Sequence, residues 1–195
     1  MSVSTLADSY FTTFAEIGRD LFLMGAIVGR EGNISMRVGD RILITRSGCR
    51  LGRLVPGDVI ETGLEPSGTD AMCSRELVVH RAIYHACDAL AVVHGHPAHT
   101  TFRSFLGESI EPLDSESKFA LGERVPVLAP AQVIASPEAA EMVARVFQAG
   151  GKVAVLRSHG PFAAGADLGE AAHYVGCLEV SCRILDLRDA TGATL

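Results

Sequence analysis

The chain has 195 residues, of which 48% are hydrophobic and 21% are charged, and its formal net charge is −6. This length and composition predict a single globular domain over residues 1–195 with a sizeable core. The acidic balance, without basic clusters, disfavours nucleic acid and anionic membranes as partners, and no apolar run reaches the roughly 20 residues of a spanning helix. A small anionic ligand is still compatible with these numbers, because a pocket can be locally positive.

Cysteine usage bears on the compartment and on the kind of metal site. The five cysteines are scattered and include no Cys-x-x-Cys pair: Cys49, Cys73, Cys87, Cys177 and Cys182. This pattern predicts reduced thiols in a cytoplasmic protein and disfavours a disulfide framework. The first ten residues contain neither the basic segment nor the apolar core of an export signal. Because the cysteines are not clustered, a transition metal is expected on histidine.

In the first half of the chain, hydrophobic periodicity and turn residues define five elements. They predict helices over 4–24 and 74–87, and strands over 33–38, 41–45 and 58–62, the last one weak. A two-residue turn at Gly39–Asp40 is expected to join the first two strands as a hairpin. Residues 62–73 are rich in turn formers, and Ser74 is expected to open the second helix.

The second half of the chain continues the alternation of strands and helices. It predicts strands over 89–94, 125–130, 152–158 and 160–165, and helices over 98–106, 136–150 and 168–188. Ser136 is the expected N-cap of the second of these helices, with Pro137 at its first position and Gly150 as its stop. The apolar strands predict an α/β fold whose sheet is covered on both faces, and the hairpin makes part of that sheet antiparallel.

Three histidines follow buried strands. Residues two apart in a strand point to the same side, so His94 and His96 can aim both imidazoles at one point, with Gly95 between them. His159 closes a second apolar strand, and adjacent strands would bring the three together as an open metal site of the Zn²⁺ type. For the pair alone, ordinary strand-end histidines are the favoured interpretation, and His159 is what makes a metal site equally compatible. For His80, His85, His99 and His173, packing or a solvated face is the favoured interpretation.

Three short segments have the composition of an anion site. They are 31–35, with Gly32 and Asn33; 45–49, with Ser47 and Gly48; and 73–76, with Ser74 and Arg75. The last segment opens a predicted helix, where free N–H groups and the helix dipole favour an anion. Each segment alone also fits a plain turn or helix cap. Glu76, expected inside that helix, becomes a candidate general acid and base if the metal lies close to it.

Five segments together identify a resemblance. "GREGNISMR", "LITRSG", "SRELVVHRAIY", "AVVHGHP" and "LRSHGPFAAG" occur in the order and spacing of the class II aldolase/adducin family, and the similarity extends from about Ala7 to Arg188. The chain looks most like the L-fuculose-1-phosphate aldolase branch of that family. The resemblance implies a three-layer α/β/α sandwich around a mainly antiparallel sheet. It also implies a C4 homotetramer with active sites at subunit interfaces.

The resemblance further assigns roles by position. His94, His96 and His159 match the zinc ligands, and Glu76 matches the catalytic acid/base. The matched phosphate-binding positions are Gly32, Asn33, Ser47, Gly48 and Ser74. Arg75 replaces a second serine of the fuculose branch, a change that would alter phosphate geometry. No tyrosine stands about 19 residues after His96, where that branch carries one for proton transfer at the aldehyde, and the C-terminal tail lacks an aromatic residue.

The leading hypothesis from the sequence is a zinc-dependent aldolase that cleaves a phosphorylated ketose to dihydroxyacetone phosphate and a small aldehyde. The second is a dehydratase or decarboxylase of sugar phosphates at the same metal. Glu116 would serve the dehydratase, since it falls about where methylthioribulose-1-phosphate dehydratases carry a catalytic glutamate; a surface position fits Glu116 equally well. Glu76 argues against the epimerase branch, which has aspartate there. A non-enzymatic, adducin-like scaffold is the remote alternative. Loss of the metal-binding histidines would mark that branch, and this chain keeps all three.

Overall fold

The computed structural model describes residues 5–193. Its strands are β1 (Asn33–Val38), β2 (Arg41–Thr45), β3 (Val59–Gly63), β4 (Ala91–His94), β5 (Ser109–Ile110), β6 (Val125–Leu128), β7 (Val153–Leu156) and β8 (Gly160–Gly165). Its α-helices are α1 (Leu6–Leu23), α2 (Leu77–Ala86), α3 (Ala98–Arg103), α4 (Ser115–Leu121), α5 (Pro137–Gln148) and α6 (Leu168–Thr191). Two short 3₁₀ helices span Leu51–Arg53 and Gly68–Met72.

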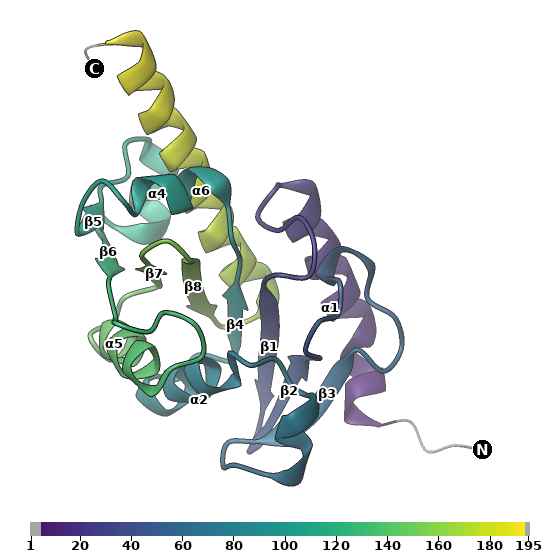
Figure 1. The fold of residues 1–195 in the computed structure, drawn as a ribbon. Coiled ribbons are helices and arrows are strands. Elements are labelled where there is room, and N and C mark those ends of the chain that lie inside the picture. Colours follow the sequence, from purple (N-terminus) through teal and green to yellow (C-terminus); the bar gives the residue numbers. More distant parts are fainter. Residues whose placement is uncertain (1–4, 194–195) are drawn as a thin grey trace.

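All eight strands form one sheet in the order β3-β2-β1-β4-β8-β7-β6-β5 (Figure 1). Every neighbouring pair is antiparallel except β6 and β7, which run parallel. The sheet is thus mixed but mainly antiparallel, and the predicted α/β sandwich is confirmed. Strands β4 and β8 lie at its centre, and the histidine segments lie at the end of β4 and just before β8.

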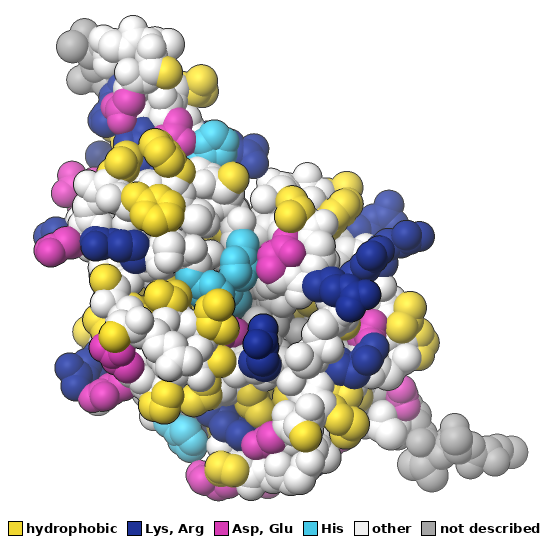
Figure 2. Space-filling view, in the orientation of Figure 1, with side chains coloured by type: hydrophobic (Ala, Val, Ile, Leu, Met, Phe, Trp, Pro, Cys, Tyr) yellow, Lys and Arg dark blue, Asp and Glu magenta, His cyan; other side chains and the backbone are white. Residues whose placement is uncertain are grey.

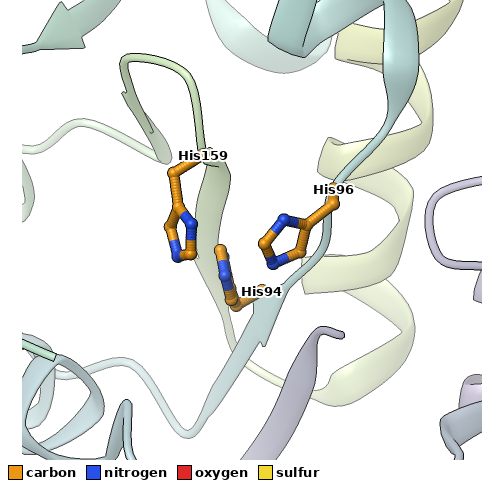
Figure 3. A group of neighbouring side chains, drawn as sticks. All are labelled: His94, His96 and His159. Carbon is orange, nitrogen blue, oxygen red and sulfur yellow. The ribbon is translucent and has the colours of Figure 1, made fainter. Parts of the chain in front are cut away.

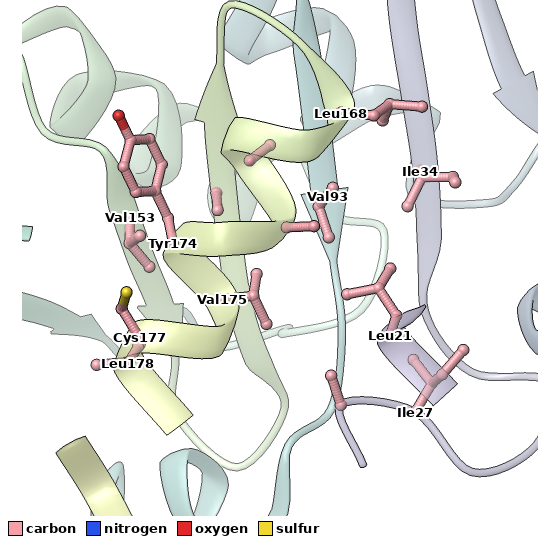
Figure 4. Close-up of a cluster of buried hydrophobic side chains, with 14 of the residues drawn as sticks. Leu21, Ile27, Ile34, Val93, Val153, Leu168, Tyr174, Val175, Cys177 and Leu178 are labelled. Carbon is pink, nitrogen blue, oxygen red and sulfur yellow. The ribbon is translucent and has the colours of Figure 1, made fainter. Parts of the chain in front are cut away.

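Helices cover both faces of the sheet and bury two hydrophobic clusters. One cluster joins α1 and α6 to the sheet through residues such as Leu21, Val93 and Val175 (Figure 4). The other packs α2 and α5 against the opposite face, where Ile42 and Val92 are fully buried. Neighbouring residues Val92 and Val93 therefore face different layers, as the period of two in a strand requires. No helix within residues 5–193 is both long and apolar enough to cross a membrane.

Several predicted element boundaries are confirmed. Val38 pairs with Arg41, so Gly39–Asp40 is the two-residue hairpin turn, and Gly39 has a φ of +63°. Ser136 caps α5, where its hydroxyl accepts a hydrogen bond from the Ala139 amide at 3.0 Å. The predicted first residue of the N-terminal helix, at position 4, lies outside the described residues.

The structure corrects the predicted helix over residues 74–87. Helix α2 begins at Leu77 and ends at Ala86, with Glu76 at its N-cap, so Glu76 does not lie inside the helix. Ser74 belongs to the preceding turn, because its amide donates to the Thr45 carbonyl at 3.0 Å and so ties the turn to the end of β2.

Besides the two 3₁₀ helices, the two-residue strand β5 and the helix α4 were not predicted. Helix α4 spans only seven residues, which is too short for a clear hydrophobic period, and Asp114 caps it by accepting from the Ser117 amide.

Candidate metal centre and anion pocket

The three predicted histidines meet at one point. His94 is the last residue of β4, His96 follows it by two residues, and His159 lies in the turn between β7 and β8 (Figure 3). One potential ligand atom from each side chain lies within 4.8 Å of the others. This spacing fits three nitrogen ligands of one divalent cation.

Close backbone packing brings these segments together. His94 pairs with Phe162 across β4 and β8, and the Gly95 amide approaches the Pro161 carbonyl at 3.4 Å. The His96 amide donates to the Ala26 carbonyl at 2.7 Å, which fixes the chain just after β4. A Cβ on Gly95 would lie 2.9 Å from that same carbonyl oxygen, so the glycine is required by the close approach.

Hydrogen bonding leaves two of the clustered histidine nitrogens without a partner. The Nδ1 atom of His94 lies 2.9 Å from the Pro161 carbonyl, an acceptor, so the proton of a neutral His94 resides on Nδ1. Its buried Nε2 has no hydrogen-bond partner in the part of the chain the structure describes, and the same holds for His159 Nε2. Two buried, unpartnered imidazole nitrogens that face each other are costly unless a cation binds between them.

The protonation states also suit a metal. Burial, together with the neighbouring imidazoles, holds the pKa of His94 well below its usual value. Burial and His159 lower the pKa of His96 to about 4. Both rings are therefore neutral at physiological pH, the form that binds a metal.

Glu76 lies beside the histidines and is 5% exposed. Its Oε1 atom accepts a hydrogen bond from the Ala135 amide at 3.1 Å and lies 3.5 Å from His159 Nε2. Its Oε2 atom is buried without a hydrogen-bond partner among residues 5–193. One oxygen is thus anchored while the other is free to exchange a proton.

The anchor of Glu76 was missed by sequence reasoning. Ala135, in the loop before α5, has a φ of +51°, a backbone conformation that residues other than glycine seldom adopt. Strain of this kind concentrates at functional sites. The sequence carries no signal for it, since alanine does not mark a left-handed backbone and the contact joins residues 59 positions apart.

The candidate anion segments open into the same pocket as the histidines. The pocket has a volume of about 430 Å³ and includes every proposed site residue except Glu116. Its lining consists of Arg30, Glu31, Gly32, Asn33, Arg46, Ser47, Gly48, Ser74, Arg75, Glu76, His94, His96, Ile134 and His159. The candidate metal ligands, the carboxylate of Glu76 and the candidate anion-binding segments therefore surround one space, which opens to the surface between the histidines and the arginines (Figure 2).

Backbone donors and positive charge suit this pocket for an anion. The amides of Gly48 and Arg75 donate no hydrogen bond within residues 5–193, and they lie at a turn and just before the N-terminus of α2. The amide of Ser74, expected to be free, is already bonded to Thr45. Sequence reasoning did not select Arg30 or Arg46, which also line the pocket. The sequence places each of them one or two residues from a selected glycine or serine.

Glu116 lies elsewhere. It is on α4 and lines a separate hollow with His173, Cys177 and Met24, among others. Of the other histidines, His80 is fully buried against the pocket residue Asn33, whereas His85 is exposed on the same helix. His99 pairs with Asp186 at 2.5 Å.

Comparison with known proteins identifies the family. Residues 12–185 match the sequence profile described as Class II Aldolase and Adducin N-terminal domain. The chain belongs to the class II aldolase and adducin family. The crystal structure of L-fuculose-1-phosphate aldolase from Thermus thermophilus superposes with a TM-score of 0.86 at 39% sequence identity. That alignment covers 95% of this chain and 97% of the aldolase.

Curated relatives of this class II aldolase family member differ in their reactions. L-fuculose phosphate aldolase of Methanocaldococcus jannaschii is 30% identical over 88% of this chain and 92% of that protein. The 3-oxo-tetronate 4-phosphate decarboxylase of Haemophilus influenzae is 31% identical over 87% of this chain and 83% of that protein. A probable bifunctional methylthioribose-1-phosphate isomerase/methylthioribulose-1-phosphate dehydratase of Nocardia farcinica is 35% identical over 50% of this chain. That match covers only 18% of the bifunctional protein.

Proposed function

We propose that the protein is a zinc-dependent aldolase that cleaves a phosphorylated ketose, of the L-fuculose-1-phosphate type, to dihydroxyacetone phosphate and a small aldehyde. The observation that carries the proposal is a single pocket. In it, two unpartnered imidazole nitrogens lie beside the free Oε2 of Glu76 and share the space with the anion-binding turn at Ser47–Gly48. A metal, a proton carrier and a phosphate site are what this reaction needs in one place.

His94, His96 and His159 would hold the cation. When bound, Zn²⁺ supplies a Lewis acid that stabilises negative charge developing at the ketose carbonyl. Three histidine ligands would leave room for substrate at the cation. The Pro161 carbonyl orients the His94 ring through Nδ1, which is the usual arrangement around a metal ligand.

Glu76 would carry the proton at carbon. Cleavage of a ketose 1-phosphate removes the proton of the C4 hydroxyl, breaks the bond between C3 and C4, and leaves the electron pair on C3. The protonated form of Glu76 donates its proton to C3, which completes dihydroxyacetone phosphate, while C4 becomes the aldehyde carbon; solvent reprotonates Glu76 before the next cleavage. The Ala135 amide holds one carboxylate oxygen, so the free Oε2 is the atom that transfers the proton.

No tyrosine of the same subunit is placed to accept the C4 hydroxyl proton. Of its three tyrosines, Tyr10 is on α1, Tyr84 is buried under the sheet, and Tyr174 donates to Glu170. None of them lines the pocket within one subunit. A neighbouring subunit or solvent would therefore complete the proton transfer.

A decarboxylase of sugar-acid phosphates is the second candidate. Arg30, Arg46 and Arg75 line the pocket, and guanidinium groups suit a substrate that carries a carboxylate as well as a phosphate. Asp58 holds Arg46 through its Nε at 3.0 Å, whereas Arg30 and Arg75 form no ion pair within residues 5–193. A dehydratase is less well supported, because Glu116 lies outside the pocket of its own subunit.

We also propose a homotetramer in the cytoplasm. The five cysteines are free, as expected for a reducing compartment. Phe102, Phe105 and Phe119 are exposed by 52%, 58% and 88% in the single chain, and subunit contacts would cover such aromatic surface. Light scattering behind size exclusion tests the assembly: a mass of four chains is expected, and a monomer would refute it.

The reaction is tested with a panel of phosphorylated C5 and C6 ketoses and the zinc-loaded protein. Dihydroxyacetone phosphate is measured by a coupled reductase. We expect cleavage of at least one ketose 1-phosphate and its loss after chelation. Carbon dioxide release from a keto-acid phosphate, without cleavage of any ketose phosphate, would favour the decarboxylase instead.

A further inference from the structure

A chain of buried hydrogen bonds ends at the anion pocket. Asn33 Oδ1 lies 2.5 Å from His80 Nε2, and His80 Nδ1 lies 2.7 Å from Ser35 Oγ. Ser35 Oγ in turn lies 2.7 Å from the Tyr84 hydroxyl. His80 and Ser35 are fully buried, and Tyr84 is 2% exposed. Of the four residues only Asn33 lines the pocket, and its Nδ2 forms no hydrogen bond within residues 5–193.

Tyr84 determines which atom donates in each of these hydrogen bonds. Burial raises the pKa of Tyr84. The residue is therefore a neutral phenol. Ser35 Oγ is the only hydrogen-bond partner of the Tyr84 hydroxyl within residues 5–193, so the phenol's own proton is directed to Ser35 Oγ.

Ser35 in turn donates its hydrogen bond to His80. A hydroxyl that receives the phenol proton offers its own proton to His80 Nδ1. Burial lowers the pKa of His80 to about 3, so the ring is neutral and carries one proton. With Nδ1 acting as an acceptor, that proton is on Nε2 and is donated to Asn33 Oδ1.

The opposite arrangement is unfavourable. A proton on His80 Nδ1 would donate to Ser35, whose hydroxyl would then donate to Tyr84. The phenol proton would lose its acceptor in the core, and a buried unsatisfied donor costs about 1–3 kcal/mol. Asn33 would also turn its carbonyl oxygen towards the pocket and repel an anion.

We propose that His80 is a positioning residue that sets the polarity of the anion pocket, holding Asn33 so that its NH₂ group faces a bound phosphate. The relay from Tyr84 through Ser35 fixes the tautomer of His80, and His80 fixes the amide. His80 does not touch the ligand. The proposal rests on the phosphate site of the proposed function and not on the reaction that follows, so it holds for an aldolase or a decarboxylase alike.

The first test reads the tautomer directly. Nitrogen-15 NMR of the ring-labelled, zinc-loaded protein distinguishes a protonated Nε2 from a protonated Nδ1 in His80. We expect Nε2–H, both with and without inorganic phosphate. A proton on Nδ1 would overturn the proposal. This measurement needs no variant and no turnover, so its failure is distinguishable from failure of the proposed reaction.

The second test measures binding of inorganic phosphate by calorimetry. His80→Phe keeps a ring in the core but removes the donor, and it should weaken phosphate binding about 10- to 100-fold, as expected for loss of a hydrogen bond to a charged group. His80→Gln keeps a neutral N–H donor and should recover most of the affinity. His85→Phe, at an exposed position on the same helix, is the matched control and should bind like the wild type.

Zinc content and thermal midpoint are compared in all variants, so that a loss of fold is recognised. The proposal is overturned if His80→Phe binds phosphate as the wild type does, or if His80→Gln is as weak as His80→Phe while both keep zinc. Absence of phosphate binding in the wild type would overturn it too, because Asn33 would then have no anion to meet.

Discussion

Gly160 and Gly95 meet backbone to backbone. A Cβ on Gly160 would overlap the carbonyl oxygen of Gly95 and would lie 3.3 Å from the Cα of His96. Gly160 directly follows His159, and Gly95 separates His94 from His96. This contact therefore sets the distance between the two histidine segments, and no larger residue allows the same approach.

Gly160→Ala should separate the metal ligands. The added methyl forces β8 away from β4, and overpacking of this kind costs about 1–3 kcal/mol. We expect a lower free energy of unfolding and reduced zinc content after gel filtration, measured by denaturant titration and elemental analysis. Gly68→Ala is the control, since a Cβ at Gly68 meets no atom within 4 Å. Full zinc occupancy in Gly160→Ala would contradict this explanation.

His94→Ala should abolish stoichiometric zinc binding. The mutation removes the most buried of the three ligands and leaves two, which is too few for a stable site. Elemental analysis and a competitive chelator titration check the result. His85→Ala removes an exposed histidine and should retain full zinc. One equivalent of zinc in His94→Ala would remove His94 from the ligand set.

Glu76→Gln should lose turnover but keep the metal. Glutamine retains an oxygen acceptor for the Ala135 amide but cannot carry the proton, and general acid/base catalysis contributes roughly 10²–10⁴-fold. We expect a fall in kcat of that size, with zinc content and the thermal midpoint preserved. Near-full activity would show that another group moves the proton.

Glu116→Ala separates aldolase from dehydratase. An aldolase that uses only the pocket residues should keep its kcat within about twofold, as expected for a side chain outside the site. Steady-state cleavage of the best ketose phosphate measures this. A loss of activity as large as that of Glu76→Gln would instead place Glu116 in the chemistry, contributed to a neighbouring subunit's pocket.

Local sequence patterns predicted the elements that carry the candidate metal site. The spacing of His94 and His96 at a strand end sets their common direction, and the hairpin at Gly39–Asp40 follows from turn chemistry. These features depend on residues close in sequence. The apolar strands predicted a sheet covered on both faces, and the family resemblance added the three-layer, mainly antiparallel arrangement and the roles of the site residues. The family match and the neighbouring structures confirm the fold.

Contacts between residues far apart in the chain could not be predicted from the sequence. The Ala135 amide reaches Glu76 from a loop, and Tyr84 and Ser35 act on Asn33 through His80. No local pattern marks a backbone donor or a buried relay. His80 was interpreted as packing or a solvated face, because a helical position alone does not show what the ring meets. Glu76 was predicted inside α2 because Ser74 was the expected N-cap. Serine is common both at N-caps and in turns, so the sequence alone does not show that the helix begins only at Leu77.

Hydrogen exchange at dihydroxyacetone phosphate tests the central claim most directly. Zinc-loaded protein is incubated with this ketone in D₂O, and the protons of its hydroxymethyl carbon are followed by ¹H NMR. Retro-aldol chemistry with Glu76 as the proton carrier predicts replacement of one of these two hydrogens by deuterium, and its loss in Glu76→Gln. Retention of both hydrogens by the zinc-loaded wild type would contradict the assignment of this pocket as an aldolase site.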